Sequence, residues 1–370
     1  MNKIPWSYII PTDLEKKLLL KAINSGWYSD GYYLRKFESK LKNFLDCKFF
    51  MTVNNCTSAI QLLFYFLKFK KNDEIIFPGY GYMAGPNIAL QMGLKPVFVD
   101  VDLKTFCINK NLIQNKISNR TKAIFLIHTY GNPCSMKSIV SIARDNNLYV
   151  IEDCAESFGS IYNKKKTGSL GDFGLFSFQS TKTITSGEGG GISINTNKTD
   201  YEKLLCLRTH GVKQKRYYHV NLSGNYRFTN IQASIAYAQF RNFKNIASKR
   251  NKIEKIYKNF FKNKIGISFQ EREKKNKIIP WTLPIVLSKK KFLKRDKIIL
   301  NLKKKNIEVR NGFYSPNQLP IYKKIDTNNL KNSDFLSRQI LCLPFYIGLK
   351  ISDIKKVCNT LLSFTILKKK

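Results

Sequence analysis

Short apolar runs alternate with amphipathic stretches along the first two-thirds of the chain. The runs are rich in Ile, Val and Phe and have the length of strands, whereas the stretches between them carry apolar residues at helical spacing. This order predicts an α/β fold with a mostly parallel central sheet that is flanked by helices. The expected strands lie at residues 49–53, 74–77, 95–99, 121–127, 148–151 and 173–178.

Two amphipathic helices are expected before the first of these strands. Leu14, Leu18 and Ala22 repeat at helical spacing and predict a helix that begins at Thr12-Asp13 and stops at Gly26. A second helix is expected over residues 34–45. Together they form an N-terminal arm that leads into the sheet.

The character of the sequence changes after about residue 240. A long basic helix is expected over residues 241–261, and it is followed by an expected strand at 281–287 and an expected helix at 297–309. We therefore expect a large domain over residues 1–240 and a smaller C-terminal α/β domain over residues 241–370.

The charge of the chain is unusual, although its composition is otherwise globular. The 370 residues are 43% hydrophobic, and 64 Lys and Arg against 25 Asp and Glu give a formal charge of +39. Such a charge could indicate binding to nucleic acid, to an anionic membrane surface or to an anionic substrate. The lysines are scattered, their runs at 164–166, 289–291 and 368–370 look like solvated loops or ends, and no RNA-binding signature or Cys/His finger accompanies them. Compositional bias is therefore favoured and no nucleic-acid partner is expected, with a non-catalytic polyanion-binding protein as the remote alternative.

The cysteines and the N-terminal residues indicate a compartment. The eight cysteines show no CxxC pair and no metal-like spacing, so we expect free thiols in a reducing cytosol and no metal site. The N-terminus lacks the apolar core of a signal peptide, and no stretch approaches the roughly 20 apolar residues of a membrane helix. A soluble, cytoplasmic protein without membrane insertion is expected.

Candidate chemistry is concentrated in residues 148–194. Asp153 follows one expected strand, at the position where open α/β sheets bind ligands, and Lys182 follows the next. Pyridoxal phosphate requires an amine that holds it as a Schiff base and a carboxylate that keeps its pyridine nitrogen protonated. Taken singly, an Asp after a strand is usually a cap and a Lys is usually a surface charge. Taken together, Asp153 and Lys182 predict the catalytic pair of a pyridoxal phosphate enzyme.

Glycines follow this lysine at Gly187 and Gly189–Gly191. They would let the backbone turn sharply and pass close to the cofactor ring and its lysine. They do not form a dinucleotide-binding motif, because they precede a strand instead of opening a helix after one. A Rossmann dehydrogenase is therefore excluded.

A second candidate site lies where the strand at 49–53 ends and a helix begins near Thr57 and Ser58. The free N–H groups of a helix N-terminus bind anions, so a cofactor phosphate could bind here. From these residues alone, an ordinary Ser/Thr helix cap is the favoured interpretation.

Two segments carry a family resemblance. IEDCAESFGS at 151–160 and GSLGDFGLFSFQSTKTITSGEGGGI at 168–192 resemble the signature of the DegT/DnrJ/EryC1/StrS sugar aminotransferases, which are fold-type I pyridoxal phosphate enzymes. The resemblance extends from about Pro5 to about Pro344 and is greatest to the 4-aminotransferases of the perosamine synthase type. It implies the same fold and cofactor for this chain.

The resemblance also implies roles for individual residues. It favours a cofactor-phosphate site at the start of this helix over a plain helix cap. Cys56-Thr57 stands where the family has Gly-Thr. It makes Arg310 and Tyr314 substrate-side candidates, and His128 a secondary candidate for which structural packing is an equal alternative. It implies cofactor contacts from Thr57, Ser58, Tyr82, Asp153, Glu156, Ser177 and Lys182, and from Asn225 into the neighbouring subunit's site, and hence a homodimer with shared active sites.

The reaction that the resemblance implies is transamination. Glutamate would supply the amino group, and the acceptor would be the C4 keto group of a nucleotide-linked 4-keto-6-deoxy sugar such as GDP-4-keto-6-deoxymannose, for surface polysaccharide or glycan biosynthesis. Amination at C3, or of a UDP- or dTDP-linked sugar, remains open. Sugar 3-dehydration is disfavoured, since family members that catalyse it carry histidine where Lys182 stands.

Overall fold

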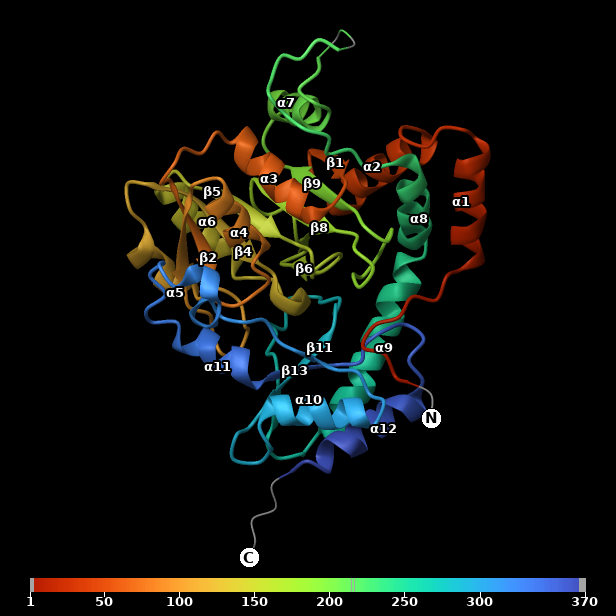
Figure 1. The fold of residues 1–370 in the computed structure, drawn as a ribbon, viewed down its shortest axis with the longest axis vertical. Helices are drawn as coiled ribbons and strands as arrows, with labels where there is room; N and C mark the ends of the chain where they lie inside the picture. The colour runs from red at the N-terminus through yellow and green to blue at the C-terminus, as the bar shows by residue number, and fades with distance from the viewer. Residues whose placement is uncertain (1–2, 214, 216, 366–370) are drawn as a thin grey trace, which may run out of the picture.

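The computed structural model describes residues 3–213, 215 and 217–365, and places them around a large and a small sheet (Figure 1). Residues 1, 2, 214, 216 and 366–370, which include the last lysine run, lie outside the described part. The longer helices are α1 (Asp13–Asn24), α2 (Tyr32–Leu45), α3 (Cys56–Phe66), α4 (Ala84–Gln91), α6 (Met136–Asp145), α7 (Lys198–Arg208), α8 (Asn230–Arg241), α9 (Phe243–Phe261), α10 (Arg295–Lys304), α11 (Lys331–Gln339) and α12 (Ile351–Leu362), with a short α5 at Lys110–Ile113. The strands are β1 (Phe49–Val53), β2 (Glu74–Pro78), β3 (Lys95–Val99), β4 (Thr121–Ile127), β5 (Tyr149–Asp153), β6 (Ile161–Tyr162), β7 (Lys165–Lys166), β8 (Phe173–Ser177), β9 (Gly190–Ile194), β10 (Ile267–Phe269), β11 (Leu283–Leu287), β12 (Arg310–Asn311) and β13 (Ile340–Leu343).

The large sheet has the strand order β1-β9-β8-β5-β4-β2-β3. The pairs from β8 to β3 are parallel, and β9 runs antiparallel to both β1 and β8. These strands are apolar on both faces, as expected for strands with helices on either side. The expected mostly parallel α/β sheet is confirmed.

Alternate side chains along these strands enter different cores. Phe125 packs with α3 and α4 in one core, whereas its neighbours Ile124 and Leu126 pack with α6 in a core on the opposite face. Toward β8, Phe176 joins a third core that contains α1, α2 and α8. The sheet is therefore the middle layer of three.

The N-terminal arm is built by strong local signals. Thr12 caps α1 in a reciprocal capping box with Glu15, and the helix is followed by Gly26 at φ +69°, a conformation that favours glycine. The buried face of α1 packs on α8, as does α2. The predicted start and end of this first helix are confirmed.

The second part of the chain forms an antiparallel sheet in the order β10-β11-β13-β12, which is packed against α9, α10 and α12. The division at residue 240 stays a prediction; it falls near the junction of α8 and α9, and each part of the chain sends a segment into the packing of the other. Tyr322 and Leu330 pack into a core of the large sheet. Conversely, Ile4 pairs with Ile307 beside the small sheet. Residues from each part of the chain therefore pack in the other part, which sequence order alone does not reveal.

None of the described helices is both long enough and apolar enough to cross a membrane. All eight cysteines are free thiols, as expected.

Candidate active site

A cavity of about 800 Å³ opens at the carboxyl ends of β5 and β8, beside the N-terminus of α3. The small domain closes its other side with residues from the start of β11 and from β12 onward. This is the ligand position expected for an open α/β sheet. It brings together the predicted residues Thr57, Ser58, Tyr82, Asp153, Glu156, Ser177, Lys182 and Arg310.

Lys182 lies in the loop after β8, and its amine faces an aromatic ring of the small domain. The Lys182 Nζ lies 4.2 Å from the centroid of the Trp281 ring, and the Trp281 Nε1–H donates a 2.9 Å hydrogen bond to the Thr181 carbonyl. A tryptophan face attracts a cationic amine and restricts where it can lie. The indole therefore holds both the lysine side chain and the loop that carries it.

Asp153 is the last residue of β5 and is 5% exposed. Its Oδ1 accepts a 2.9 Å hydrogen bond from the Ala155 amide. Burial raises the pKa of Asp153, and the Ala155 hydrogen bond and the positive charge of Lys182 only partly oppose this shift. A buried carboxylate of this kind gains from a cationic partner, such as a protonated pyridine nitrogen.

The N-terminus of α3 is capped by Asn55, whose Oδ1 accepts the Ser58 amide at 2.8 Å. The predicted Ser/Thr cap is therefore an Asn cap. The amides of Cys56 and Thr57 lie in the first turn, where no intrahelical carbonyl is available to them. Because this end of the helix lines the cavity, these two amides and the nearby hydroxyls can bind an anion.

The glycine run approaches this same helix end. A Cβ on Gly190 would lie 2.5 Å from the Asn55 carbonyl carbon and 2.6 Å from the Cys56 nitrogen. The expected close approach exists, but it is made to the start of α3 and not to Lys182. Gly190 therefore allows β9 to lie against the anion-binding turn.

Glu156 lies below the cavity and is 3% exposed. Its Oε2 accepts a 2.7 Å hydrogen bond from the Tyr130 amide, and burial raises the pKa of Glu156 to about 7. Tyr130 adopts φ +56°, an uncommon conformation for a bulky side chain and one found more often at functional sites. The strained turn at Tyr130 thus presents its amide to the carboxylate.

Three nearly parallel rings line one wall of the cavity, with Tyr130 from the loop after β4 and Trp281 and Phe313 from the second part of the chain. Tyr130 stacks with Trp281 and Phe313, at interplanar angles of 12° and 14°. Tyr82, at 63% exposure, stands at the mouth, 6.4 Å from Phe313 between ring centroids. Sequence reasoning missed Tyr130 and Phe313, although Tyr130 directly follows the His128 strand end, a position that points to a ligand site.

Trp6 also lines the cavity and was missed. The Phe345 amide donates to the Trp6 carbonyl at 2.9 Å, which fixes the N-terminal segment on the small domain. The Arg310 guanidinium lies 4.2 Å from the centre of the Trp6 ring. Arg310, half exposed, is thus held at the cavity by an aromatic face.

Three predicted residues lie elsewhere. Tyr314 is 48% exposed and outside the cavity lining, and Asn225 is exposed, with its Oδ1 accepting the Arg227 amide. His128 is fully buried and lies outside the cavity lining, a position that favours the packing alternative over a contact with substrate.

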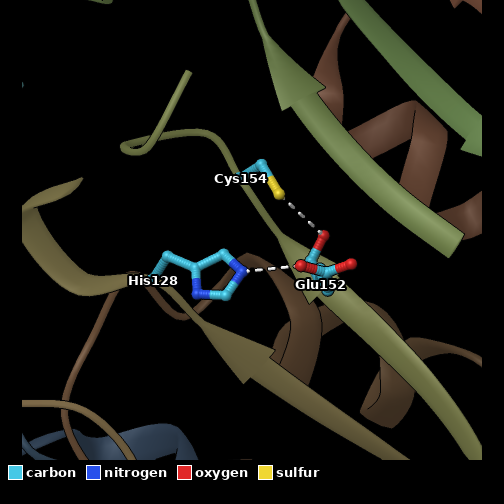
Figure 2. A group of neighbouring side chains, drawn as sticks. All are labelled: His128, Glu152 and Cys154. Atoms are coloured by element: carbon cyan, nitrogen blue, oxygen red, sulfur yellow. Dashed lines mark hydrogen bonds and ion pairs between the residues drawn. The ribbon is translucent and has the colours of Figure 1, made fainter. Parts of the chain in front are cut away.

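Figure 2 shows His128 hydrogen-bonded to Glu152, with Cys154 beside them. The Cys134 amide donates to His128 Nδ1 at 3.0 Å, so the proton is on Nε2, which donates to Glu152 Oε2 at 2.9 Å. Glu152 is fully buried in β5 and ties the strand to the loop before β8. Its two oxygens also accept the amides of Gly168, Leu170 and Gly171.

Cys154 lies beside this pair, and the three side chains could in principle hold a metal ion. The Cys154 thiol instead lies 3.7 Å from the Glu152 carbonyl oxygen, and burial raises the pKa of that thiol well above its usual range. Both ring nitrogens of His128 are already engaged. The cluster is therefore a hydrogen-bonded support for β4 and β5.

Comparison with known proteins decides the family. The model of the DegT/DnrJ/EryC1/StrS aminotransferase family matches residues 11–362. This chain belongs to that family. The expected fold-type I architecture, pyridoxal phosphate dependence and aminotransferase class are thereby confirmed.

Individual relatives of this aminotransferase cover nearly its full length. It is 34% identical over 355 residues to the GDP-perosamine synthase of Vibrio cholerae, covering 95% of this chain and 96% of the relative. It is 35% identical over 366 residues to that of Escherichia coli O157:H7, covering 98% and 99%. Among solved structures, Helicobacter pylori PseC, an aminotransferase involved in the biosynthesis of pseudoaminic acid, matches with a TM-score of 0.93 and 25% identity, covering 98% and 99%.

The donor set of the cavity fits pyridoxal phosphate. An amine, a buried carboxylate and an anion-binding helix end converge on one space of about 800 Å³, and a ring can be stacked at its mouth. Each chemical group of the cofactor thus has a matching group in this chain.

Proposed function

We propose that this aminotransferase transfers an amino group from glutamate to the C4 keto group of a nucleotide-linked 4-keto-6-deoxy sugar, with GDP-4-keto-6-deoxymannose as the first candidate, in surface polysaccharide or glycan biosynthesis. The observation that carries the proposal is that Lys182 and Asp153, from the ends of neighbouring strands, line one cavity with the N-terminus of α3. The perosamine synthase relatives support GDP as the nucleotide of the substrate and C4 as the carbon that is aminated.

When bound, pyridoxal phosphate supplies the electron sink of the reaction. Asp153 would hold a proton on its pyridine nitrogen, and Glu156 would face its ring hydroxyl. Thr57 and Ser58, together with Ser177, would bind the phosphate, and Tyr82 would cover the ring.

Lys182 would hold the cofactor and, once released from it, move the proton between the substrate carbon and the cofactor. A base in this role must lie within hydrogen-bond reach of the carbon that loses the proton. The Trp281 face restricts the amine to the cavity side of the loop. A flexible lysine side chain is thereby pre-positioned for its task.

Arg310 would meet the anionic part of the substrate. Its guanidinium lines the cavity and lies over the Trp6 ring, and its one ion pair among the described residues is a long 3.9 Å contact with Glu308, so its fork remains available for a carboxylate or a diphosphate. Tyr314 is on the same segment and would reach a substrate that extends out of the cavity.

We also propose a homodimer in which Asn225 of one copy reaches the phosphate in the other. Asn225 pairs with Thr209, the residue that follows α7, and the segment after α7 projects from the molecule (Figure 1). Exposed apolar side chains gather on this segment and on residues 27–32, which Asn230 ties to the start of α8 through the Trp27 carbonyl. Such a set of side chains is typical of an interface; its members are Trp27, Tyr28, Tyr32, Tyr217, Tyr218, Val220 and Leu222.

The test is an activity panel on the purified protein. GDP-, UDP- and dTDP-linked 4-keto sugars are supplied with glutamate, and the aminated product is analysed for the position of its new nitrogen. The wild type is expected to aminate the GDP sugar at C4. Amination at C3, or of only a UDP or dTDP sugar, would move the assignment to the alternative within the family.

The matched variants are Lys182→Ala and Lys137→Ala, the second at an exposed position on α6. Lys182→Ala is expected to lose both the absorbance of the lysine-bound cofactor and turnover, and Lys137→Ala to keep both. The remote alternative, a non-catalytic polyanion-binding protein in the cytoplasm, requires instead that Lys182→Ala changes nothing and that binding to a polyanion weakens steeply with salt.

A further inference from the structure

Arg250 is a buried cation on α9 without an anionic partner. It is 5% exposed, and burial lowers its pKa to about 10, with no carboxylate in the described part of the chain close enough to pair with it. Burying an unpaired charge is costly, since the charge loses its hydration and gains no counter-ion. A residue of this kind is retained for what its hydrogen bonds hold.

Its hydrogen bonds go to backbone carbonyls on the two sides of the cavity. Arg250 Nη1 donates to the Trp281 carbonyl at 2.8 Å and to the Pro280 carbonyl at 3.4 Å. Arg250 Nη2 donates to the Lys182 carbonyl at 3.4 Å. One guanidinium therefore joins the segment just before β11 to the loop that carries Lys182.

These bonds close a ring of contacts around the lysine. The Trp281 indole donates to the Thr181 carbonyl, and the Lys182 amine lies over the same indole. Arg250 thus fixes the backbone behind both partners of the amine–indole contact. A lysine could not replace it, because a single ammonium lacks the planar fork that reaches both carbonyls.

We propose that Arg250 is a positioning residue, which holds Trp281 and the Lys182 backbone in register so that the lysine amine stays over the indole and directed into the cavity. The proposal rests on the proposed function only in treating Lys182 as the reacting amine. Through Arg250, the position of the Lys182 amine also depends on the position of α9, which packs on the small sheet.

The first test needs no cofactor. Cofactor-free wild type, Arg250→Met, Arg250→Lys and Lys249→Met are treated briefly with formaldehyde and a borane reductant, and the methylation rate of Lys182 is measured by peptide mass spectrometry. Lys249→Met is the charge-matched control, exposed and adjacent on α9. We expect Lys182 in Arg250→Met to react at least about 3-fold faster, since its amine is no longer held against the ring, and Lys249→Met to match the wild type.

The second test uses the loaded enzyme. In Arg250→Met we expect kcat to fall by about 10-fold or more with the KM for the keto sugar little changed, because a displaced amine slows proton transfer without touching the sugar contacts. Arg250→Lys, which keeps the charge, is expected to lie between wild type and Arg250→Met in both tests.

Equal Lys182 methylation rates and equal kcat in Arg250→Met and Lys249→Met would overturn the proposal. Should Arg250→Met fail to fold, Arg250→Lys decides it: wild-type values for both measurements would overturn it, and faster methylation would support it. A wild type that binds no pyridoxal phosphate would end the proposed function, whereas the methylation rates would still decide the role of Arg250.

Discussion

The side-chain nitrogen of Lys182 lies 4.2 Å from the centre of the Trp281 ring. The lysine follows a strand of the large sheet, and the tryptophan precedes a strand of the small sheet. The Lys182 amine is therefore positioned by both parts of the chain, and a change in either part can alter its surroundings.

Trp281→Phe tests this contact. The variant keeps an aromatic ring but loses the hydrogen bond to the Thr181 carbonyl, and phenylalanine attracts a cation less strongly than tryptophan. We expect kcat to fall by about 10-fold, as for a misplaced catalytic group, and the free energy of unfolding to fall by about 1–2 kcal/mol for the carbonyl left unpaired. Steady-state kinetics and urea denaturation measure the two effects. An unchanged kcat would show that the indole does not position the amine.

Asp153→Asn tests the carboxylate. The amide has the same shape but cannot hold a proton on a pyridine nitrogen, so the cofactor should still bind while kcat falls by at least about 100-fold. Cofactor content by absorbance and turnover with glutamate check both expectations. Asp145→Asn, at an exposed position on α6, is the control and should leave both unchanged. Full turnover in Asp153→Asn would assign the ring proton to another group.

Glu156 predicts how stability depends on pH in the cofactor-free protein. Its pKa is raised from 4.5 to about 7 on folding, so between these values the folded state binds more protons than the unfolded state. The stability from this group is full below about pH 4.5 and is lost as the pH rises past 7, at most about 3 kcal/mol. Burial shifts the pKa of Asp153 in the same direction.

We expect the unfolding temperature of the cofactor-free wild type to decrease from pH 5 to pH 8, and that of Glu156→Gln to decrease less. Thermal unfolding across this range measures the difference between the two curves. Parallel curves would mean that Glu156 does not titrate in this window.

Glu152→Gln should affect stability much more than catalysis. The carboxylate accepts hydrogen bonds from backbone amides of the loop before β8 and from the His128 Nε2–H. A glutamine would turn its carboxamide NH2, itself a donor, toward some of these donors. We expect a loss of about 3 kcal/mol in the free energy of unfolding, with kcat of the remaining folded enzyme within about 3-fold of wild type. Urea denaturation is the measurement. Stabilisation of the wild type by added zinc would contradict the structural role and favour a metal site at His128, Glu152 and Cys154.

Local signals explain what could be predicted. The apolar runs and the helical repeats between them identified the strands of the parallel sheet, because covered strands must be apolar on both faces. The capping pattern at Thr12 located α1. Asp153 and Lys182 could be predicted as site residues because each lies at or shortly after the end of a recognisable strand, and such ends meet at one edge of a sheet.

The sequence by itself determined the α/β class and the family, and it predicted the lysine–carboxylate pair, since each depends on short stretches of chain. Only the tertiary structure decided that Trp281 and Arg250 contact Lys182 and that Tyr130 stacks on Trp281, because these contacts join segments that no local pattern connects. It also showed that His128 is buried and bonded to Glu152 and Cys134, since burial and hydrogen-bond partners arise only when β4, β5 and their loops come together.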